Sequence, residues 1–312
     1  MKKAVTIKSL RKNIPNRYKI LDFLLELRTD FWVWDVPTLV LSPVSRDVAV
    51  WYQKFETAIF RAISDKNFLP IIRASDGEYR FLLGPQLPSR RLPLGKRIIS
   101  YLKYIHAKIH EKQHGFKGQT APGVSVGDYS AMELKHGRGV FIDGMLSVLK
   151  NGLLAAHLQF TPKPFQECYH PAFKRFLEDY KAELTADNYV PFYFVYLFLS
   201  RVATADLLRG RSVLFINRAS EAKRQVIDAR FEQYGVEETR WISLSRDRSL
   251  FDRIELTEKD LLSDICILGG GVGKFNLIQQ LEIFPGPVVD AGYYFEAWAN
   301  PDIAKRRPLC IV

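Results

Sequence analysis

The segment DICILGGGVGK, residues 264–274, decides the fold expected for this chain. Its apolar half is typical of a strand buried on both faces, and its glycines lead into a short helix through Leu281. A comparable strand, SVLFIN (212–217), is followed by helical spacing over 219–235, and GPVVDAG (286–292) adds a further strand. Strands that alternate with helices at this spacing predict a parallel sheet covered on both faces.

The rest of the chain extends this pattern. A loop rich in glycine is expected at 115–127, of the kind that often covers a site. We therefore predict an α/β, Rossmann-like domain over residues 46–312, with a mostly parallel sheet flanked by helices. The further helices are expected at 47–67, 95–114 and 129–151, and the further strands at 68–75, 153–160 and 240–245.

Residues 1–45 form a separate N-terminal extension in this prediction. RYKILDFLLELR (17–28) has helical apolar spacing, and FWVWDVPTLVL (32–42) carries two tryptophans. A basic, aromatic-rich segment of this kind can lie on a bilayer surface. The alternative is a helix packed on the main core, and we favour that interpretation.

Composition bears on the expected partners and location of the protein. The 312 residues carry a net charge of +11, which favours polyanionic partners without choosing among them. Cys168, Cys266 and Cys310 are widely spaced and give no zinc knuckle or disulfide framework, so a reducing cytoplasm is expected. No apolar run approaches the ~20 residues of a membrane span. The expected location is cytoplasmic, with the inner face of the membrane left open.

The glycine run at 269–271, which follows the strand in DICILGGGVGK, is a candidate phosphate site. Gly269, Gly270 and Gly271 would let backbone N–H groups approach a phosphate, and Lys274 would add a charge. The run matches neither the Walker A pattern nor the dinucleotide fingerprint. A tight turn between strand and helix would need the same glycines, and this alternative stays open.

Cations also follow the strand at 212–217. Arg218, Lys223 and Arg224 crowd the first turns of a helix, where positive charge opposes the helix dipole unless an anion binds. A solvated helix face is the alternative. We count Arg218 and Lys223 as candidate ligands of a nucleotide.

Two carboxylates mark the last strand. In VVDAGYYFEAW (288–298), Asp290 ends the strand and Glu296 follows it. Ligands of open α/β sheets bind at the carboxyl ends of strands, which makes Asp290 and Glu296 candidate catalytic residues. Capping of the following turn is the alternative role for Asp290.

HEKQH (110–114) satisfies the zincin pattern of two histidines one helical turn apart. Lys112 stands where such motifs are usually apolar, and Gly115 ends the helix at once. We keep a zinc-dependent hydrolase as an alternative, and a solvated histidine face as the simpler explanation. Aromatic and basic residues interleave over 101–117, so a non-catalytic nucleic-acid-binding module is a second alternative. No nucleic-acid motif accompanies them, and nucleic acid is not the expected partner.

The segment IIRASDGEYRFLLG (71–84) carries the central hypothesis. Asp76 and Glu78 flank Gly77 at a strand end, where both carboxylates could hold one Mg²⁺ or Mn²⁺ ion. Such an ion neutralises charge on a departing nucleoside diphosphate. Acidic residues are also favoured in the first turn of any helix, which is the simpler explanation.

These residues resemble the R-x-G-D-G-E signature of bacterial GT-D-type glycosyltransferases. The resemblance spans about residues 50–300 by architecture but only two short stretches by motif. It implies that Asp76 and Glu78 are the metal-binding pair and that Arg73 is the signature arginine. It also implies that Asp290 and Gly292 form the late strand end.

What the resemblance implies for function is transfer of a sugar from a nucleoside-diphosphate donor, typically UDP-linked. The acceptor would be a glycan, a glycoprotein or a lipid-linked glycan, as in polysaccharide biosynthesis. Ser75 replaces the usual glycine, and Tyr293 stands where a histidine is expected. Arg73, Lys274 and Arg218 or Lys223 would stabilise phosphate charge.

Overall fold

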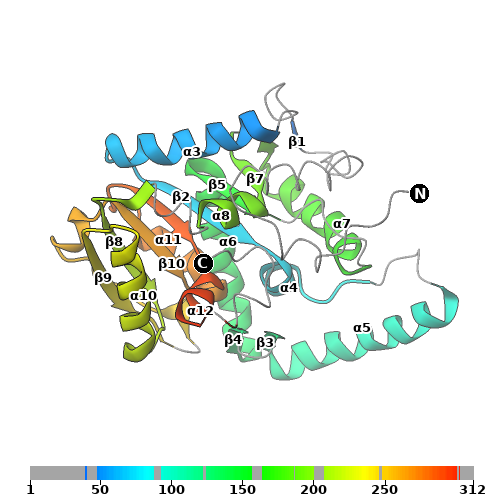
Figure 1. The fold of residues 1–312 in the computed structure, drawn as a ribbon. Coiled ribbons are helices and arrows are strands. Elements are labelled where there is room, and N and C mark those ends of the chain that lie inside the picture. The colour runs from blue at the N-terminus through cyan, green and yellow to red at the C-terminus, as the bar shows by residue number, and fades with distance from the viewer. Residues whose placement is uncertain are drawn as a thin grey trace.

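The computed structural model describes most of the chain outside its N-terminal and C-terminal segments. Figure 1 shows a central sheet with helices on both sides and one long helix, α5, that extends away from this body. The predicted helix at 17–28 lies outside the described residues, as does 32–42 apart from Leu39–Val40, which pairs with Leu184–Thr185 as β1 with β6. The described residues are 39–40, 48–87, 93–121, 124–156, 164–185, 187–199, 207–245, 248–300 and 302.

The central sheet has seven strands, and every pair of neighbours is parallel. Their order is β7-β5-β2-β11-β10-β8-β9. This confirms the predicted Rossmann-like α/β architecture. The strands are β2 (Leu69–Ala74), β5 (Leu153–Ala156), β7 (Tyr189–Pro191), β8 (Ser212–Asn217), β9 (Glu238–Ser243), β10 (Ile265–Gly269) and β11 (Pro287–Asp290).

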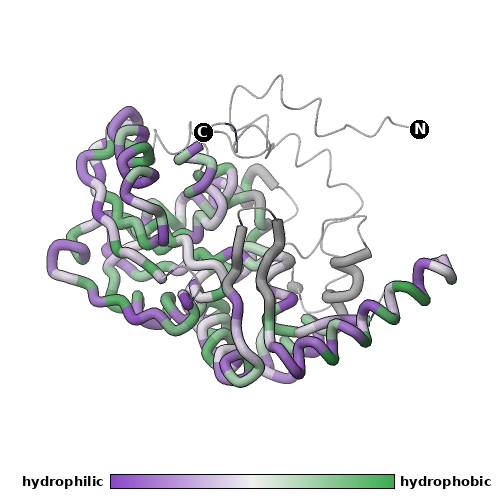
Figure 2. Tube along the Cα trace, turned by 90° about the horizontal axis from the view of Figure 1, so that it is seen from below, coloured by the Kyte–Doolittle hydropathy of each residue, from purple (hydrophilic) through white to green (hydrophobic). Residues whose placement is uncertain are grey.

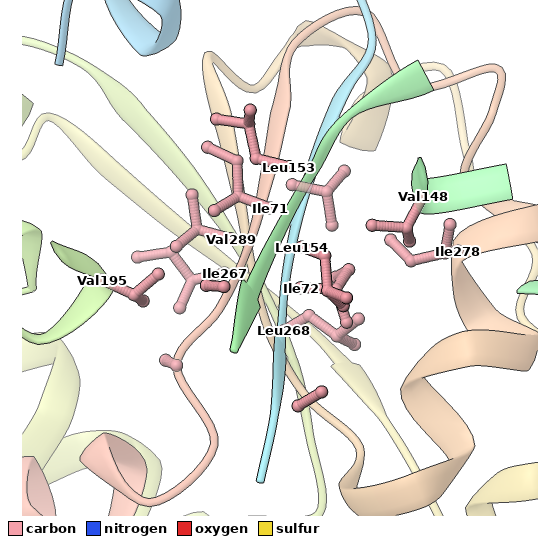
Figure 3. Close-up of a cluster of buried hydrophobic side chains, with 14 of the residues drawn as sticks. Ile71, Ile72, Val148, Leu153, Leu154, Val195, Ile267, Leu268, Ile278 and Val289 are labelled. Atoms are coloured by element: carbon pink, nitrogen blue, oxygen red, sulfur yellow. The ribbon is translucent and has the colours of Figure 1, made fainter. Parts of the chain in front are cut away.

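The inner strands are apolar along most of their length because both of their faces are covered, and their polar residues lie mainly at their ends. Every residue of β10 and β11 is buried. Figure 3 shows Ile71, Ile267 and Val289 on the side of Val195, with Ile72, Leu154 and Leu268 on the side of Val148 and Ile278. The alternation of strand side chains therefore fills two hydrophobic layers, one on each side of the sheet.

Helices α6 and α11 cover one face of the sheet, and α3, α8, α10 and α12 cover the other (Figure 1). Gly144 lets α6 pack closely against α11, since a Cβ there would lie 1.9 Å from the carbonyl oxygen of Phe275 in α11. The helices are α3 (Val48–Ser64), α4 (Asp76–Leu83), α5 (Leu94–His114), α6 (Ala131–Asn151), α7 (Pro164–Asp179), α8 (Phe192–Phe198), α10 (Glu221–Gln233), α11 (Lys274–Gln280) and α12 (Tyr294–Ala299).

The predicted loop at 115–127 is wrong in part, because the structure has an antiparallel hairpin there. Its strands are β3 (Phe116–Ala121) and β4 (Val124–Tyr129), and their register shifts twice. The hairpin is held because Phe116 and Tyr129 pack on Phe81 of α4, with ring centroids 5.2 and 5.6 Å away. Gly115, at φ +80°, supplies the left-handed turn that ends α5 before the hairpin.

Candidate functional site

Four charged side chains meet at the carboxyl edge of the sheet, and we call them the buried charge network. Arg73 lies at the end of β2, Glu78 in the first turns of α4, Lys274 at the start of α11 and Asp290 at the end of β11. Each of these residues is at most 5 % exposed. Charged residues are rarely buried so completely unless they are paired.

Lys274 is the centre of the buried charge network. Its Nζ lies 2.6 Å from Glu78 Oε1 and 2.8 Å from Asp290 Oδ2. Arg73 donates to the same Asp290 Oδ2 from its backbone N and from Nε, each at 3.3 Å. One carboxylate oxygen thus accepts from two cations, while the ammonium joins two carboxylates.

The other oxygen of Asp290 has no such partner. Oδ1 is buried and accepts no hydrogen bond from the described residues. A buried polar atom without a partner is rare and points to a ligand, an ion or a water molecule at that position. Asp290 Oδ1 is therefore open to a further contact.

Asp290 is charged at neutral pH. Burial alone would raise its pKa, but attraction to Lys274 and then to Arg73 outweighs burial and holds the pKa below its usual value. For Arg73, burial would lower the pKa, and the Asp290 charge overcomes this to raise it above its usual value. The two residues therefore stabilise each other's ionised forms.

Glu78 also has a local role in α4. Its Oε2 accepts hydrogen bonds from the backbone N of Ser75 at 3.0 Å and from Ser75 Oγ at 3.1 Å. This completes a capping box at the helix N-terminus, the first-turn role that the sequence left open as the alternative. Asp76 is the first residue of α4, next to Gly77, and its side chain lies outside the described part of the structure.

The predicted metal site is compatible with the donor atoms but is not a preformed cage. Glu78 Oε1 has a lone pair beyond the one that Lys274 uses, and carboxylate oxygen suits Mg²⁺ or Mn²⁺. Among the described residues, no three or more His, Cys, Asp or Glu side chains are grouped to hold a metal ion. Lys274 supplies the positive charge beside the carboxylates of Glu78 and Asp290.

Arg73 is fixed by more than its ion pair. Its guanidinium carbon lies 5.1 Å from the ring centroid of Phe192 and 5.2 Å from that of Tyr196, both in α8. Gly292 leaves room for it, since a Cβ there would lie 1.9 Å from Arg73 Nη2. The aspartate-x-glycine pattern at 290–292 is therefore explained by the packing of this arginine.

The glycine run has a structural explanation of its own. A Cβ on Gly269 would lie 2.4 Å from Asn217 Nδ2, and Gly271 has φ +54°. Gly270 connects the end of β10 to the short 3₁₀ turn that precedes α11. The structure thus contains the tight strand-to-helix turn that the sequence offered as the alternative to a phosphate loop.

The same turn lies at the topological switch point of the sheet. The connection from β8 leads outward to β9, while the connection from β10 leads the other way to β11. Ligands of open α/β sheets bind in the crevice outside strand ends of this kind. Asn217 crosses the switch point, donating from Nδ2 to the Gly269 carbonyl at 2.7 Å. Sequence analysis did not single out Asn217, although a polar residue that ends an apolar strand is a usable signal.

The candidate cations after β8 have partners within the protein. Lys223 Nζ lies 2.6 and 2.8 Å from the two carboxylate oxygens of Glu296, so the structure joins two residues that were predicted separately. Arg224 donates to Ser243 Oγ at 2.5 Å and lies over the ring of Trp241. Arg218 is half-buried just beyond β8.

The zincin-like motif lies on α5, away from the buried charge network (Figure 1). The rings of His110 and His114 are 4.8 Å apart, as expected one turn apart on a helix. Glu111, which would act as the general base, instead forms an ion pair with Arg138 of α6 at 2.7 Å. The described residues give a zinc hydrolase no support.

No model of a known protein family, no curated protein and no solved structure matches this chain. Of the helices that the structure describes, none has the length and apolar content needed to cross a bilayer.

Proposed function

We propose that this protein is a glycosyltransferase that moves a sugar from a nucleoside-diphosphate donor, UDP being the first to test, to a glycan or glycoconjugate acceptor. The observation that carries the proposal is the buried charge network of Arg73, Glu78, Lys274 and Asp290. It occupies the carboxyl edge of a parallel sheet, next to the topological switch point, where such sheets bind nucleotides. It also includes three of the residues that carry the family resemblance.

Stability alone does not account for the buried charge network. Replacing a buried ion pair by well-packed apolar residues is often neutral or stabilising, so retaining four buried charges favours a functional role. Shifted pKa values, such as the raised pKa of Arg73 and the lowered pKa of Asp290, cluster at functional sites. The open Oδ1 of Asp290 supports a ligand-binding role further.

In this proposal Arg73 and Lys274 hold positive charge where the donor diphosphate binds. Mg²⁺ or Mn²⁺ bound by Asp76 and Glu78 would neutralise charge on the departing diphosphate. Arg73 is oriented by its ion pair with Asp290 and by the two aromatic rings of α8. The turn at Gly269–Gly271 and Arg218 would form the adjoining wall of the nucleotide site.

Asp290 fits a positioning role better than that of acceptor base. Its lowered pKa makes it a weak proton acceptor, and both of its cationic partners use Oδ2. By holding Lys274 and Arg73 side by side, it fixes the charge that meets the diphosphate. Glu296, the other carboxylate considered as a base, is held by Lys223.

A thermal-shift and donor-hydrolysis screen tests the proposal. UDP or another nucleoside diphosphate with Mn²⁺ should raise the melting temperature, because a ligand at 100 times its Kd adds about 2.7 kcal/mol to the free energy of unfolding. Hydrolysis of one nucleotide sugar should depend on the metal and be lost in Glu78→Gln. The exposed Glu258→Gln serves as the matched control and should behave as wild type. No thermal shift with any nucleoside diphosphate, with or without metal, would overturn the proposal.

A further inference from the structure

Helix α5 is attached to the body at one end only. It runs from Leu94 to His114, all described, and none of its 21 residues is buried. Figures 1 and 2 show its N-terminal half projecting beyond the sheet and its covering helices. Its C-terminal half contacts α6 through the ion pair between Glu111 and Arg138. A helix this long normally buries one face against a core. The exposed apolar face of α5 is therefore expected to bind a partner.

The helix has an exposed apolar stripe along one face, and only its last member, Ile109, lies near α6. Of the seven exposed large apolar side chains of α5, all but Ile99 recur every three or four residues, and each of these six is between 38 and 64 % exposed. Tyr104, Ala107 and Glu111 are less exposed, and their positions lie about a third to half a turn around the helix from the centre of the stripe. The α5 stripe comprises Leu94, Ile98, Tyr101, Leu102, Ile105 and Ile109.

The polar part of α5 is strongly basic. The helix has one acidic residue, Glu111, and that residue is already paired with Arg138. Arg97 and Lys108 lie along one edge of the α5 stripe, Lys112 follows its last member, and Lys96 and Lys103 lie on the opposite face, so the helix carries a large excess of positive charge. These cations, all exposed, are Lys96, Arg97, Lys103, Lys108 and Lys112.

A hollow at the base of α5 has the same character. It has a volume of about 550 Å³ and lies between α5 and α6. Lys108, Lys112, Lys135 and Arg138 contribute to its lining, against the single carboxylate of Glu111. A polyanionic surface would therefore find positive charge both along the helix and at its base.

We propose that α5 docks this protein on an anionic lipid bilayer, lying in the plane of the membrane surface. The α5 stripe enters the boundary between headgroups and acyl chains, and the flanking cations contact lipid phosphates. An exposed apolar face with basic flanks is the combination that such a surface complements. A second copy of α5 fits less well, because stripe-to-stripe pairing would bring Arg97, Lys108 and Lys112 of both copies to the same interface. This assignment is independent of the proposed catalytic function.

Sedimentation with vesicles tests the docking. The full chain should bind vesicles of phosphatidylcholine with phosphatidylglycerol, bind phosphatidylcholine alone much more weakly, and lose affinity as salt is raised. Leu102→Glu should weaken binding by about tenfold or more, because it removes a buried apolar side chain from the interface. Arg97→Gln with Lys108→Gln should weaken it by about 25-fold, at roughly fivefold per cation.

Val226→Glu in α10 is the matched control. Val226 is an apolar residue that is also well exposed, at 45 %, and its substitution should leave vesicle binding unchanged. The α5 variants should keep the wild-type melting temperature, since their side chains support no core. Absence of binding to anionic vesicles at low salt would overturn the proposal, as would wild-type binding by Leu102→Glu. A dimer in sedimentation velocity that Leu102→Glu breaks, without vesicle binding, would assign the α5 stripe to a second copy instead.

Discussion

Lys274 in α11 is buried and Leu102 in α5 is exposed, the reverse of what is usual for lysine and leucine. The lysine is 4 % exposed among carboxylates, whereas the leucine is 61 % exposed on a projecting helix. Buried charge and exposed large apolar surface are the two departures from ordinary burial that carry information about function. The comparison separates a site that recognises a small ligand by charge from a surface that recognises a large partner by its apolar face.

Replacing each residue by one that suits its environment should change the free energy of unfolding by very different amounts. Lys274→Met leaves Glu78 and Asp290 without their shared cation and should lower the free energy of unfolding by about 3–5 kcal/mol. Leu102→Gln should change it by less than about 0.5 kcal/mol, because the side chain is exposed. Urea unfolding followed by circular dichroism measures both. The exposed Lys259→Met is the control for Lys274→Met, and equal losses in these two variants would show that the buried charge network contributes nothing.

Glycine substitutions sharpen the comparison with a smaller effect. Gly292→Ala places a Cβ against Arg73 at a backbone φ of +43° and should cost about 1–3 kcal/mol. Gly95→Ala in α5, where a Cβ meets nothing within 4 Å, should stabilise the chain by about 0.5–1 kcal/mol. Melting temperatures should therefore move in opposite directions. A stable Gly292→Ala variant would mean that Arg73 has room to move.

The pH dependence of stability gives the smallest effect, since it follows one ionisation. The folded-state pKa of Asp290 lies below its unfolded value, so its contribution is present above the unfolded pKa and is lost as pH falls through the folded pKa. Urea unfolding between pH 6 and pH 3 should show a smaller acid loss in Asp290→Asn than in wild type. Identical acid losses in the two proteins would contradict the assigned direction of the shift. Leu102→Gln should retain the wild-type profile.

Much of the fold could be predicted from the sequence because its central parallel strands are mainly apolar. The predicted strand at 212–217 matches β8, and the helix at 95–114 matches α5 within one residue. Helical spacing did not tell which way the apolar face of α5 points. Tyr101 is exposed because the N-terminal half of α5 projects beyond the body.

The candidate site could be predicted only as separate residues. Arg73 and Asp290 are 217 positions apart and meet because β11 lies beside β2, an order that no local pattern reveals. Lys274 was expected on a phosphate, and its position between two carboxylates depends on the same order. The aromatic contacts of Arg73 were missed as well, because PFYFVYLF (191–198) looks like ordinary core sequence.

The place of β11 in the sheet also bears on how the chain is made. During synthesis, β2 leaves the ribosome early, yet its neighbour on one side is the last strand of the sheet. Until residues 287–290 emerge, the sheet consists of two groups of strands with a gap between β2 and β10. Such long-range pairing slows folding and exposes apolar edges meanwhile. A nascent chain would therefore need protection from aggregation until its final strand closes the gap.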